Sequence, residues 1–114
     1  MITIYHNPRC SKSRECHLIL SDAKKDIEVI NYLKTPFSEE KLTEIISFLG
    51  ISPLELVRTN ETIWKENFKG KTLSDSVIIK AMVANPKLIE RPIVVFEKNA
   101  IIARPPEKVL AFIS

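Results

Sequence analysis

The sequence predicts a mixed α/β fold in which a β-α-β half and a β-β-α half are separated by a helical segment. Two observations predict it: short β-branched segments lie near both ends, and apolar residues recur at helical spacing between them. The length of 114 residues allows one domain, and such a chain buries enough surface to fold without a disulfide or metal. Two cysteines are too few for a disulfide scaffold, and the 27% of charged residues, of mixed sign, argues against disorder.

The first half follows from the first third of the chain. Ile2–His6 is β-branched and aromatic and is followed by an Asn-Pro dipeptide, which predicts a strand. From Ser11 to about Lys24 the apolar residues follow the period of a helix. The members of this stripe are Cys16, Ile19, Leu20 and Ala23. A second strand is predicted from Ile27 to about Leu33, before Thr35-Pro36.

Helices are predicted over about residues 38–86. Ser38 is placed to cap a helix with two glutamates in its first turn, and Gly50 suits its C-terminal cap. The buried stripe expected for this helix is Leu42, Ile45, Ile46 and Leu49. Three further helical pieces are expected at Pro53–Val57, Glu61–Phe68 and Ser74–Asn85. The stripe of the last is Val77, Ile78, Ala81 and Met82, and Asn85-Pro86 ends it.

The C-terminal part predicts a hairpin and a helix. Ile93–Phe96 and Ala100–Ala103 are strand candidates joined by a polar turn, and Pro105 opens a helix that continues through Phe112. The β-α-β unit implies parallel strands, and the last unit an antiparallel pair. This order is the thioredoxin arrangement with a helical insertion at about 38–86, and we expect one such domain over residues 1–114.

The net charge of +3 has one local source. Arg9, Lys12 and Arg14 have no acidic residue among them, and without them the basic residues fall to 14, equal to the 14 acids. This indicates a local anion site and not the broad basic stripe that nucleic acid requires. The sequence has no apolar run of about 18–20 residues and no signal-peptide pattern. We therefore expect a cytoplasmic protein with reduced thiols and with no nucleic-acid or membrane partner.

Cys10 lies where the first predicted strand turns into the first helix. Unpaired backbone N–H groups and nearby cations lower the pKa of a thiol at such a position, so the nucleophilic thiolate is favoured. Arg14, with Arg9 or Lys12, is placed to contribute, and the Ser13 hydroxyl is placed to donate to the sulfur. We interpret Cys10 as a reactive thiol. His6 either tunes this thiol or is a half-buried residue at a strand end, and the sequence leaves both interpretations open.

The spacing around Cys10 argues against three familiar kinds of site. A dithiol redox motif needs cysteine where Ser13 stands, and a phosphatase loop needs arginine where Cys16 stands. A zinc site is disfavoured because Cys10 and Cys16, the cysteines near His6 and His17, are farther apart than the closely paired cysteines of such sites. No metal is therefore expected. Six residues of helix separate the two cysteines by a rise of about 9 Å, beyond the Cα separation of about 7 Å that a disulfide allows. Cys16 is therefore predicted to be structural.

Several segments together resemble a known family. They are His6-Asn7-Pro8-Arg9-Cys10-Ser11-Lys12-Ser13-Arg14, then Arg58, Arg91-Pro92-Ile93-Val94-Val95 and Arg104-Pro105. This pattern resembles the ArsC-type arsenate reductases that use glutathione and glutaredoxin, and the resemblance runs from Ile2 to about Phe112. It implies a thioredoxin-like fold with a helical insertion, Cys10 as the nucleophile, and Pro92 as a cis-proline facing it.

The resemblance also implies the roles of other residues. Arg58, Arg91 and Arg104 match the arginines that hold the oxyanion. The residues that match neighbours of the thiolate are His6, Asn7, Ser13 and Arg14. The planar fork of arginine suits a tetrahedral oxyanion such as arsenate.

The implied reaction begins with attack of the Cys10 thiolate on arsenic, while cations stabilise the developing charge. Glutathione then acts as a co-substrate and glutaredoxin resolves a mixed disulfide, so no bound cofactor is expected. A chain with one usable thiol needs such an external reductant.

Two other functions fit part of the pattern. An Spx-like regulator that binds RNA polymerase shares much of the cysteine segment, but Ser13 argues against its usual dithiol switch. A glutathione-dependent thiol reductase with another substrate is the second alternative. Trp64 and Phe68, with the lysines at 65, 69 and 71, are interpreted as packing within the insertion and as solvated charge.

Overall fold

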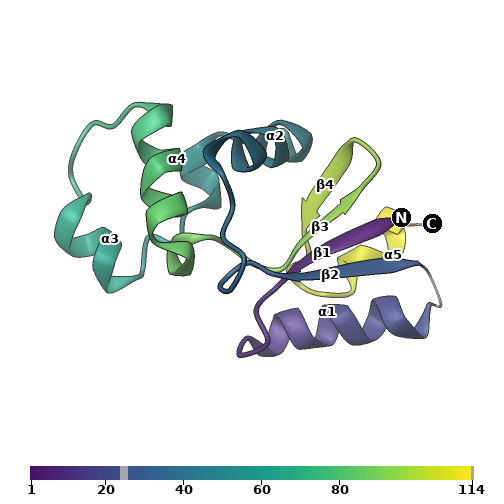
Figure 1. The fold of residues 1–114 in the computed structure, drawn as a ribbon. Coiled ribbons are helices and arrows are strands. Elements are labelled where there is room, and N and C mark those ends of the chain that lie inside the picture. Colours follow the sequence, from purple (N-terminus) through teal and green to yellow (C-terminus); the bar gives the residue numbers. More distant parts are fainter. Residues whose placement is uncertain (24–25, 114) are drawn as a thin grey trace. The chain divides into compact units, whose positions relative to one another are not determined.

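The chain alternates strands and helices in the predicted order, so the mixed α/β class is confirmed (Figure 1). The computed structural model describes residues 1–23 and 26–113. Its elements are β1 (Ile2–His6), α1 (Ser11–Asp22), β2 (Ile27–Asn31), α2 (Glu39–Leu49), the 3-10 helix η1 (Pro53–Leu56), α3 (Thr62–Asn67), α4 (Asp75–Ala84), the 3-10 helix η2 (Pro86–Leu88), β3 (Ile93–Phe96), β4 (Asn99–Ile102) and α5 (Lys108–Ile113). The chain forms two compact units, one of Met1–Thr35 with Arg91–Ser114 and one of Pro36–Glu90. The predicted insertion lies within the second.

The first unit is built on a four-stranded sheet of order β2-β1-β3-β4. The central strand β1 pairs parallel with β2, and Ile2 lies opposite Ile27. It pairs antiparallel with β3, and Ile4 lies opposite Val94. The predicted β-α-β crossover and the β3–β4 hairpin are thereby confirmed.

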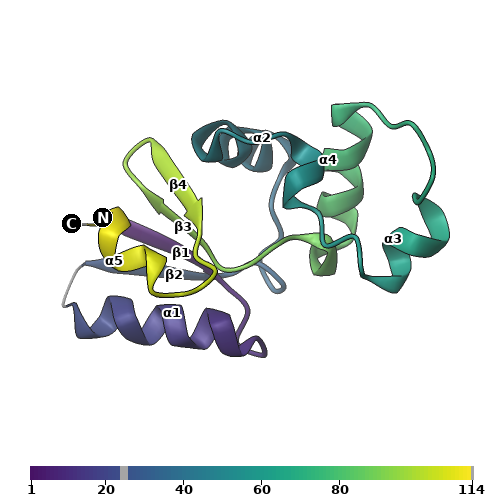
Figure 2. The same ribbon diagram turned by 180° about the vertical axis from the view of Figure 1, so that it is seen from behind.

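Helices α1 and α5 cover one face of this sheet (Figure 2). Alternate residues of a strand point to the same face, so Ile2 and Ile4 both contribute to the core beneath the helices. The buried members of this core are Ile2, Ile4, Cys16, Leu20, Val94, Ala103, Val109 and Ile113. Cys16 is fully buried here, as predicted from its stripe, and burial raises the pKa of its thiol to about 12. The thiol is therefore protonated and inaccessible at neutral pH.

Replacing Cys16 by serine should lower the free energy of unfolding by about 1–3 kcal/mol, because a hydroxyl would be buried among apolar side chains. Cys16→Ala, which removes the sulfur without adding a polar group, should cost about 1 kcal/mol. Urea unfolding followed by circular dichroism measures both differences. Equal stability of the serine variant and the wild type would contradict the burial of this side chain.

Local capping signals set the ends of the helices in the second unit. The Ser38 hydroxyl accepts the backbone N–H of Lys41 at 3.0 Å, and the Ser74 hydroxyl accepts that of Val77 at 3.3 Å. Gly50 ends α2 in the left-handed conformation at φ 69°, which glycine adopts without steric cost. The predicted α2 stripe is buried at Leu42, Ile45 and Ile46, and Leu49 is half-buried. These predictions are confirmed.

The predicted stripe of α4 is wrong at one position. Val77 is 42% exposed, and Ile79 is buried in its place. Successive residues of an α-helix are rotated by about 100° around its axis, so Val77 and Ile79 lie about 100° to either side of Ile78. Both are apolar, so the periodicity gave no way to choose between them.

Two predicted strands also have different bounds. The second strand ends at Asn31 and not near Leu33, because the chain turns after Asn31. The side-chain oxygen of Asn31 accepts the backbone N–H of Leu33, and its backbone carbonyl accepts the N–H of Thr35. The hairpin partner spans Asn99–Ile102 and not Ala100–Ala103. The predicted end of the first helix near Lys24 lies outside the described residues.

The last helix begins at Lys108 and not at Pro105. The backbone N–H groups of Lys108 and Val109 donate to the carbonyls of Pro105 and Pro106, three residues earlier. The chain therefore makes tight turns before the helix starts. In the described part of the chain, none of the helices has both the length and the apolar character needed to cross a membrane.

Candidate active site

A tight loop carries the chain from β1 into α1 and leaves Cys10 at the helix N-terminus. The backbone N–H of Cys10 donates to the carbonyl of Asn7 at 3.0 Å, and the side-chain oxygen of Asn7 accepts the N–H of Arg9 at 3.0 Å. Cys10 is the N-cap residue, with an extended backbone (φ −96°, ψ 123°), and its carbonyl accepts the N–H of Arg14. The half-buried sulfur thus lies beside N–H groups that have no partner within the helix.

The thiolate form of Cys10 is stabilised by its surroundings. Burial alone raises the pKa of the thiol, but the backbone N–H of Ser13, the guanidinium of Arg91 and the backbone N–H of Lys12 act in the opposite direction. Their combined effect holds the pKa of Cys10 below its ordinary value. Because the thiolate is the reacting form, this environment favours nucleophilic attack.

Ser13 is fully buried, and its hydroxyl holds the loop together. The hydroxyl oxygen lies 2.7 Å from Nδ1 of His6 and accepts the backbone N–H of Asn7 at 3.0 Å. From the sequence, this hydroxyl is expected to donate to the Cys10 sulfur. In the structure, the group of Ser13 that stabilises the thiolate is its backbone N–H, and the hydroxyl joins the end of β1 to the first turn of α1.

His6 is 8% exposed and bonded to Ser13, so it supports the loop that carries Cys10. Burial lowers the pKa of His6, and the charges of His17 and Arg14 lower it further, against a smaller opposite effect of Ser13. Its ring meets the ring of His17 edge to face, with centroids 5.2 Å apart. This contact of His17 is not predictable from the sequence, because spacing alone does not show which helical residue meets a strand end.

The lowered pKa of His6 predicts a loss of stability in acid. The unfolded chain takes up a proton on this histidine near pH 6.5, while the folded protein takes it up only at lower pH. The free energy of unfolding should therefore fall as the pH decreases through about 6.5. NMR titration should place the pKa of His6 below 6.5, and His17→Gln should raise it. A His6 pKa at or above 6.5 in the wild type would contradict this account.

Arg91 is brought to Cys10 by the sheet. It precedes β3, whose first residue Ile93 pairs with Tyr5 near the end of β1 where the cysteine loop begins. The guanidinium of Arg91 acts on the thiolate, and its buried Nε has no hydrogen-bond partner among the described residues. This N–H is therefore a hydrogen-bond donor that the described residues leave unused.

The other residues around Arg91 belong to the same unit. The Arg91–Pro92 peptide bond is cis, the isomer that the resemblance implies, and Pro92 is buried. The exposed Arg104 donates from its guanidinium to the Arg91 carbonyl at 3.3 Å, and its own bond to Pro105 is cis as well. Two of the three predicted arginines are therefore neighbours in the structure.

The basic residues next to Cys10 in sequence act differently from expectation. Arg14 donates to the carbonyl of Pro8 at 2.9 Å and so fastens the loop. Lys12 lies 3.8 Å from Glu15 in an exposed ion pair, and Arg9 is exposed. Of the cationic side chains, the one that lowers the pKa of Cys10 comes from position 91.

Arg58 belongs to the second unit. Its backbone N–H donates to the carbonyl of Leu88 at 2.7 Å, and its guanidinium pairs with Glu61 at 2.6 Å. Both charged side chains are about 70% buried, and the pair holds the chain between η1 and α3. The role of Arg58 with an oxyanion stays a prediction.

Within residues 1–23 and 26–113, His, Cys, Asp and Glu side chains do not gather in groups of three or more that could hold a metal ion. The site of the first unit therefore consists of a thiol, backbone N–H groups and arginines. This combination suits nucleophilic attack on an anionic centre.

Comparison with known proteins agrees with this geometry. The model of the ArsC family matches residues 5–112. The chain belongs to the ArsC family. The family resemblance predicted from the Cys10, Arg91 and Arg104 segments is thereby confirmed, and membership of this family supports an oxidoreductase activity.

The ArsC relatives match almost the whole chain. The arsenate reductase of Haemophilus influenzae is 39% identical over 111 residues, which are 96% of each chain. The uncharacterized protein YfgD of Escherichia coli K12 is 47% identical over 114 residues, covering 98% of this chain and 96% of the relative. The solved arsenate reductase of Vibrio cholerae superposes with a TM-score of 0.91 at 44% identity and covers 96% of this chain and 95% of its own. The predicted thioredoxin-like fold with a helical insertion is confirmed by this likeness.

Proposed function

We propose that this protein reduces arsenate to arsenite with glutathione and glutaredoxin as its source of electrons. The observation that carries the proposal is the Cys10 thiol, whose pKa is lowered by N–H groups of α1 and by the Arg91 guanidinium. The relatives named arsenate reductase support the choice of substrate. The remaining chemistry is argued from the residues of the site.

In the first step, the Cys10 thiolate attacks the arsenic atom of arsenate. A sulfur–arsenic bond forms, and a hydroxyl group of arsenate takes up a proton and leaves as water as its bond to arsenic breaks. The N–H groups of Ser13 and Lys12 and the guanidinium of Arg91 stabilise the Cys10 thiolate, and they would also stabilise the negative charge that develops on the arsenate oxygens. Arg104 adds a planar donor fork beside Arg91, and Arg58 is included on the family resemblance alone.

In the second step, the thiolate of glutathione attacks the Cys10 sulfur. The sulfur–arsenic bond breaks, and its electron pair stays on arsenic, which is reduced from As(V) to As(III) and leaves as arsenite. Cys10 is left in a mixed disulfide with glutathione. A glutaredoxin thiolate then attacks the glutathione sulfur, takes over the disulfide and releases the Cys10 thiolate.

The need for external thiols follows from the other sulfur of the chain. Cys16 is fully buried, and the pKa of its thiol is raised to about 12. It is therefore neither ionised nor exposed enough to attack a mixed disulfide on Cys10. Ser13 occupies the position at which dithiol enzymes carry their second cysteine.

The test is a reconstituted assay of arsenite formation from arsenate. The purified protein with glutathione and glutaredoxin should produce arsenite, and omission of any one of the three should stop it. Arsenite no faster than without the protein would overturn the proposal. Mass spectrometry of the protein adds a second measurement, because glutathione on Cys10 without arsenate turnover would favour a thiol reductase with another substrate.

A further inference from the structure

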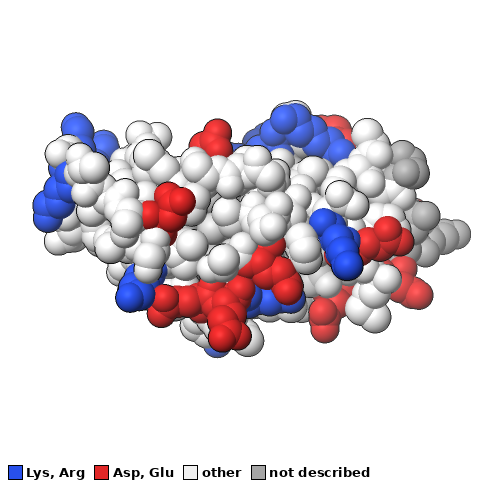
Figure 3. Space-filling view, turned by 90° about the horizontal axis from the view of Figure 1, so that it is seen from above, with Lys and Arg blue, Asp and Glu red and all other residues white. Residues whose placement is uncertain are grey.

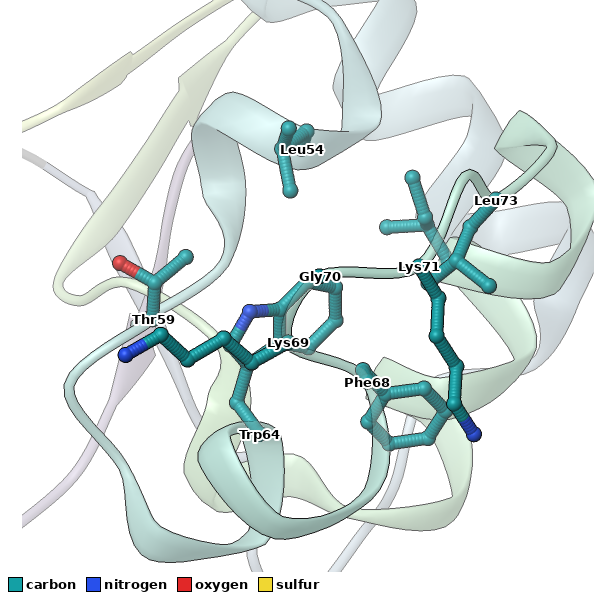
Figure 4. Close-up of a pocket in the computed structure, with 9 residues that line it drawn as sticks. Leu54, Thr59, Trp64, Phe68, Lys69, Gly70, Lys71 and Leu73 are labelled. Atoms are coloured by element: carbon teal, nitrogen blue, oxygen red, sulfur yellow. The ribbon is translucent and has the colours of Figure 1, made fainter.

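The second unit contains a pocket of about 250 Å³ between η1, α3 and the start of α4 (Figure 4). Part of its lining is apolar, with Leu54, Trp64 and Leu73, and part is polar, with Thr59, Lys69 and Lys71. From the sequence, this region is interpreted as packing within the insertion and as solvated charge. The structure shows that the packing leaves a space, so the region has a surface that a ligand can enter.

Aromatic stacking holds the apolar part of the pocket in place. The rings of Trp64 and Phe68 stack with centroids 5.1 Å apart and an angle of 27° between their planes. Trp64 is only 6% exposed, so its position is set by its neighbours, whereas Leu54 across the pocket is 48% exposed. A ligand with an apolar body would cover Leu54 and contact the fixed indole ring, and both contacts favour binding.

The charged part of the lining is of one sign. Among the described residues that line the pocket there are two lysines and no acidic residue. Figure 4 draws the ammonium end of Lys69 on the side of Thr59, whose hydroxyl is a second hydrogen-bond donor. Figure 3 shows basic side chains at the end of the view where Figure 1 draws α3. This environment attracts an anion and disfavours a cation.

We propose that the pocket binds a small organic carboxylate, with its apolar body against Trp64 and its carboxylate held by Lys69 and Thr59. The volume limits the size, since pockets for drug-sized ligands measure about 300–1,000 Å³ and this one is smaller. One aromatic ring or one short branched chain fits that limit. The proposal does not depend on arsenate chemistry, because every residue it uses lies in the second unit.

The pocket carries its own reporter, because Trp64 is the only tryptophan of the chain. Phenylacetate should change the tryptophan fluorescence in a saturable way, with a dissociation constant of about 1 mM, as small ligands of this size allow. Phenylacetamide has the same ring without the charge and should bind about threefold more weakly, the effect of one exposed ion pair. Absence of saturation by phenylacetate up to about twenty times that constant would overturn the proposal.

Two lysine variants test whether the carboxylate is recognised. Lys69→Gln should weaken phenylacetate binding about threefold and leave phenylacetamide binding unchanged. Lys65→Gln is the matched control, because this exposed lysine lies on α3 but does not line the pocket. Equal affinity for acid and amide, or equal effects of the two variants, would overturn the assignment of Lys69. Backbone amide shifts of Gly70 in the NMR spectrum provide a readout that does not depend on fluorescence.

Discussion

Cys10→Ser is expected to abolish arsenite formation, with a loss of at least about a thousandfold, because a serine hydroxyl is not ionised at neutral pH and cannot replace the thiolate. The arsenite assay measures the loss, and alkylation by iodoacetamide followed by mass spectrometry should show that the rapidly modified site has disappeared. The variant should fold normally, since the half-buried Cys10 is not part of the core cluster.

Cys16→Ala is the matched control for this experiment. It removes the other sulfur of the chain, which is fully buried and protonated, so turnover and rapid alkylation of Cys10 should both persist. Retention of arsenite formation by Cys10→Ser, or its loss in Cys16→Ala with the fold intact, would show that the nucleophile has been assigned to the wrong cysteine.

Arg91→Gln should raise the pKa of Cys10, because it removes the guanidinium, with its hydrogen bond and its positive charge, from the thiolate. Turnover should fall by about a hundredfold to a thousandfold, the usual effect of losing one donor to a developing charge. The rate of iodoacetamide alkylation as a function of pH reports the pKa, and the arsenite assay reports turnover. Arg91→Lys keeps the charge but loses the planar fork, so its turnover should lie between the wild type and the glutamine variant.

Arg9→Gln provides the comparison for Arg91. Arg9 is adjacent to Cys10 in the sequence, but its side chain is exposed and does not contribute to the lowered pKa of the thiol. The dependence of the alkylation rate on pH, and thus the pKa of Cys10, should therefore be the same in Arg9→Gln as in the wild type. A pKa of Cys10 that rises in Arg9→Gln and not in Arg91→Gln would reverse the electrostatic argument for this site.

The elements that the sequence predicted well are those with local causes. The strand Ile2–His6 depends on its own β-branched residues, and the helix after Ser38 depends on a serine cap and a terminal glycine. These signals lie within a few residues of the structure that they specify. The position of Cys10 at a helix N-terminus was predictable for the same reason.

What the sequence did not show depends on contacts between distant segments. Cations next to Cys10 in the chain were expected to lower the pKa of the thiol, whereas the pairing of β1 with β3 brings Arg91 to it. The contact of His17 with His6 and the space beside Trp64 likewise arise only when elements pack together. No residue spacing within one segment encodes such a contact or such a space.

The Ser13 oxygen is bonded on two sides, to the imidazole of His6 and to the amide of Asn7. A single change to cysteine would restore the dithiol spacing, but the larger sulfur would have to fit where those two short bonds now close the loop. One substitution at Ser13 is therefore not expected to give the protein an internal dithiol that replaces the external reductant. Under the proposed chemistry, the rate of arsenate reduction in a cell would depend on the concentration of reduced glutathione. Depletion of glutathione should therefore stop the reaction even while arsenate is still present.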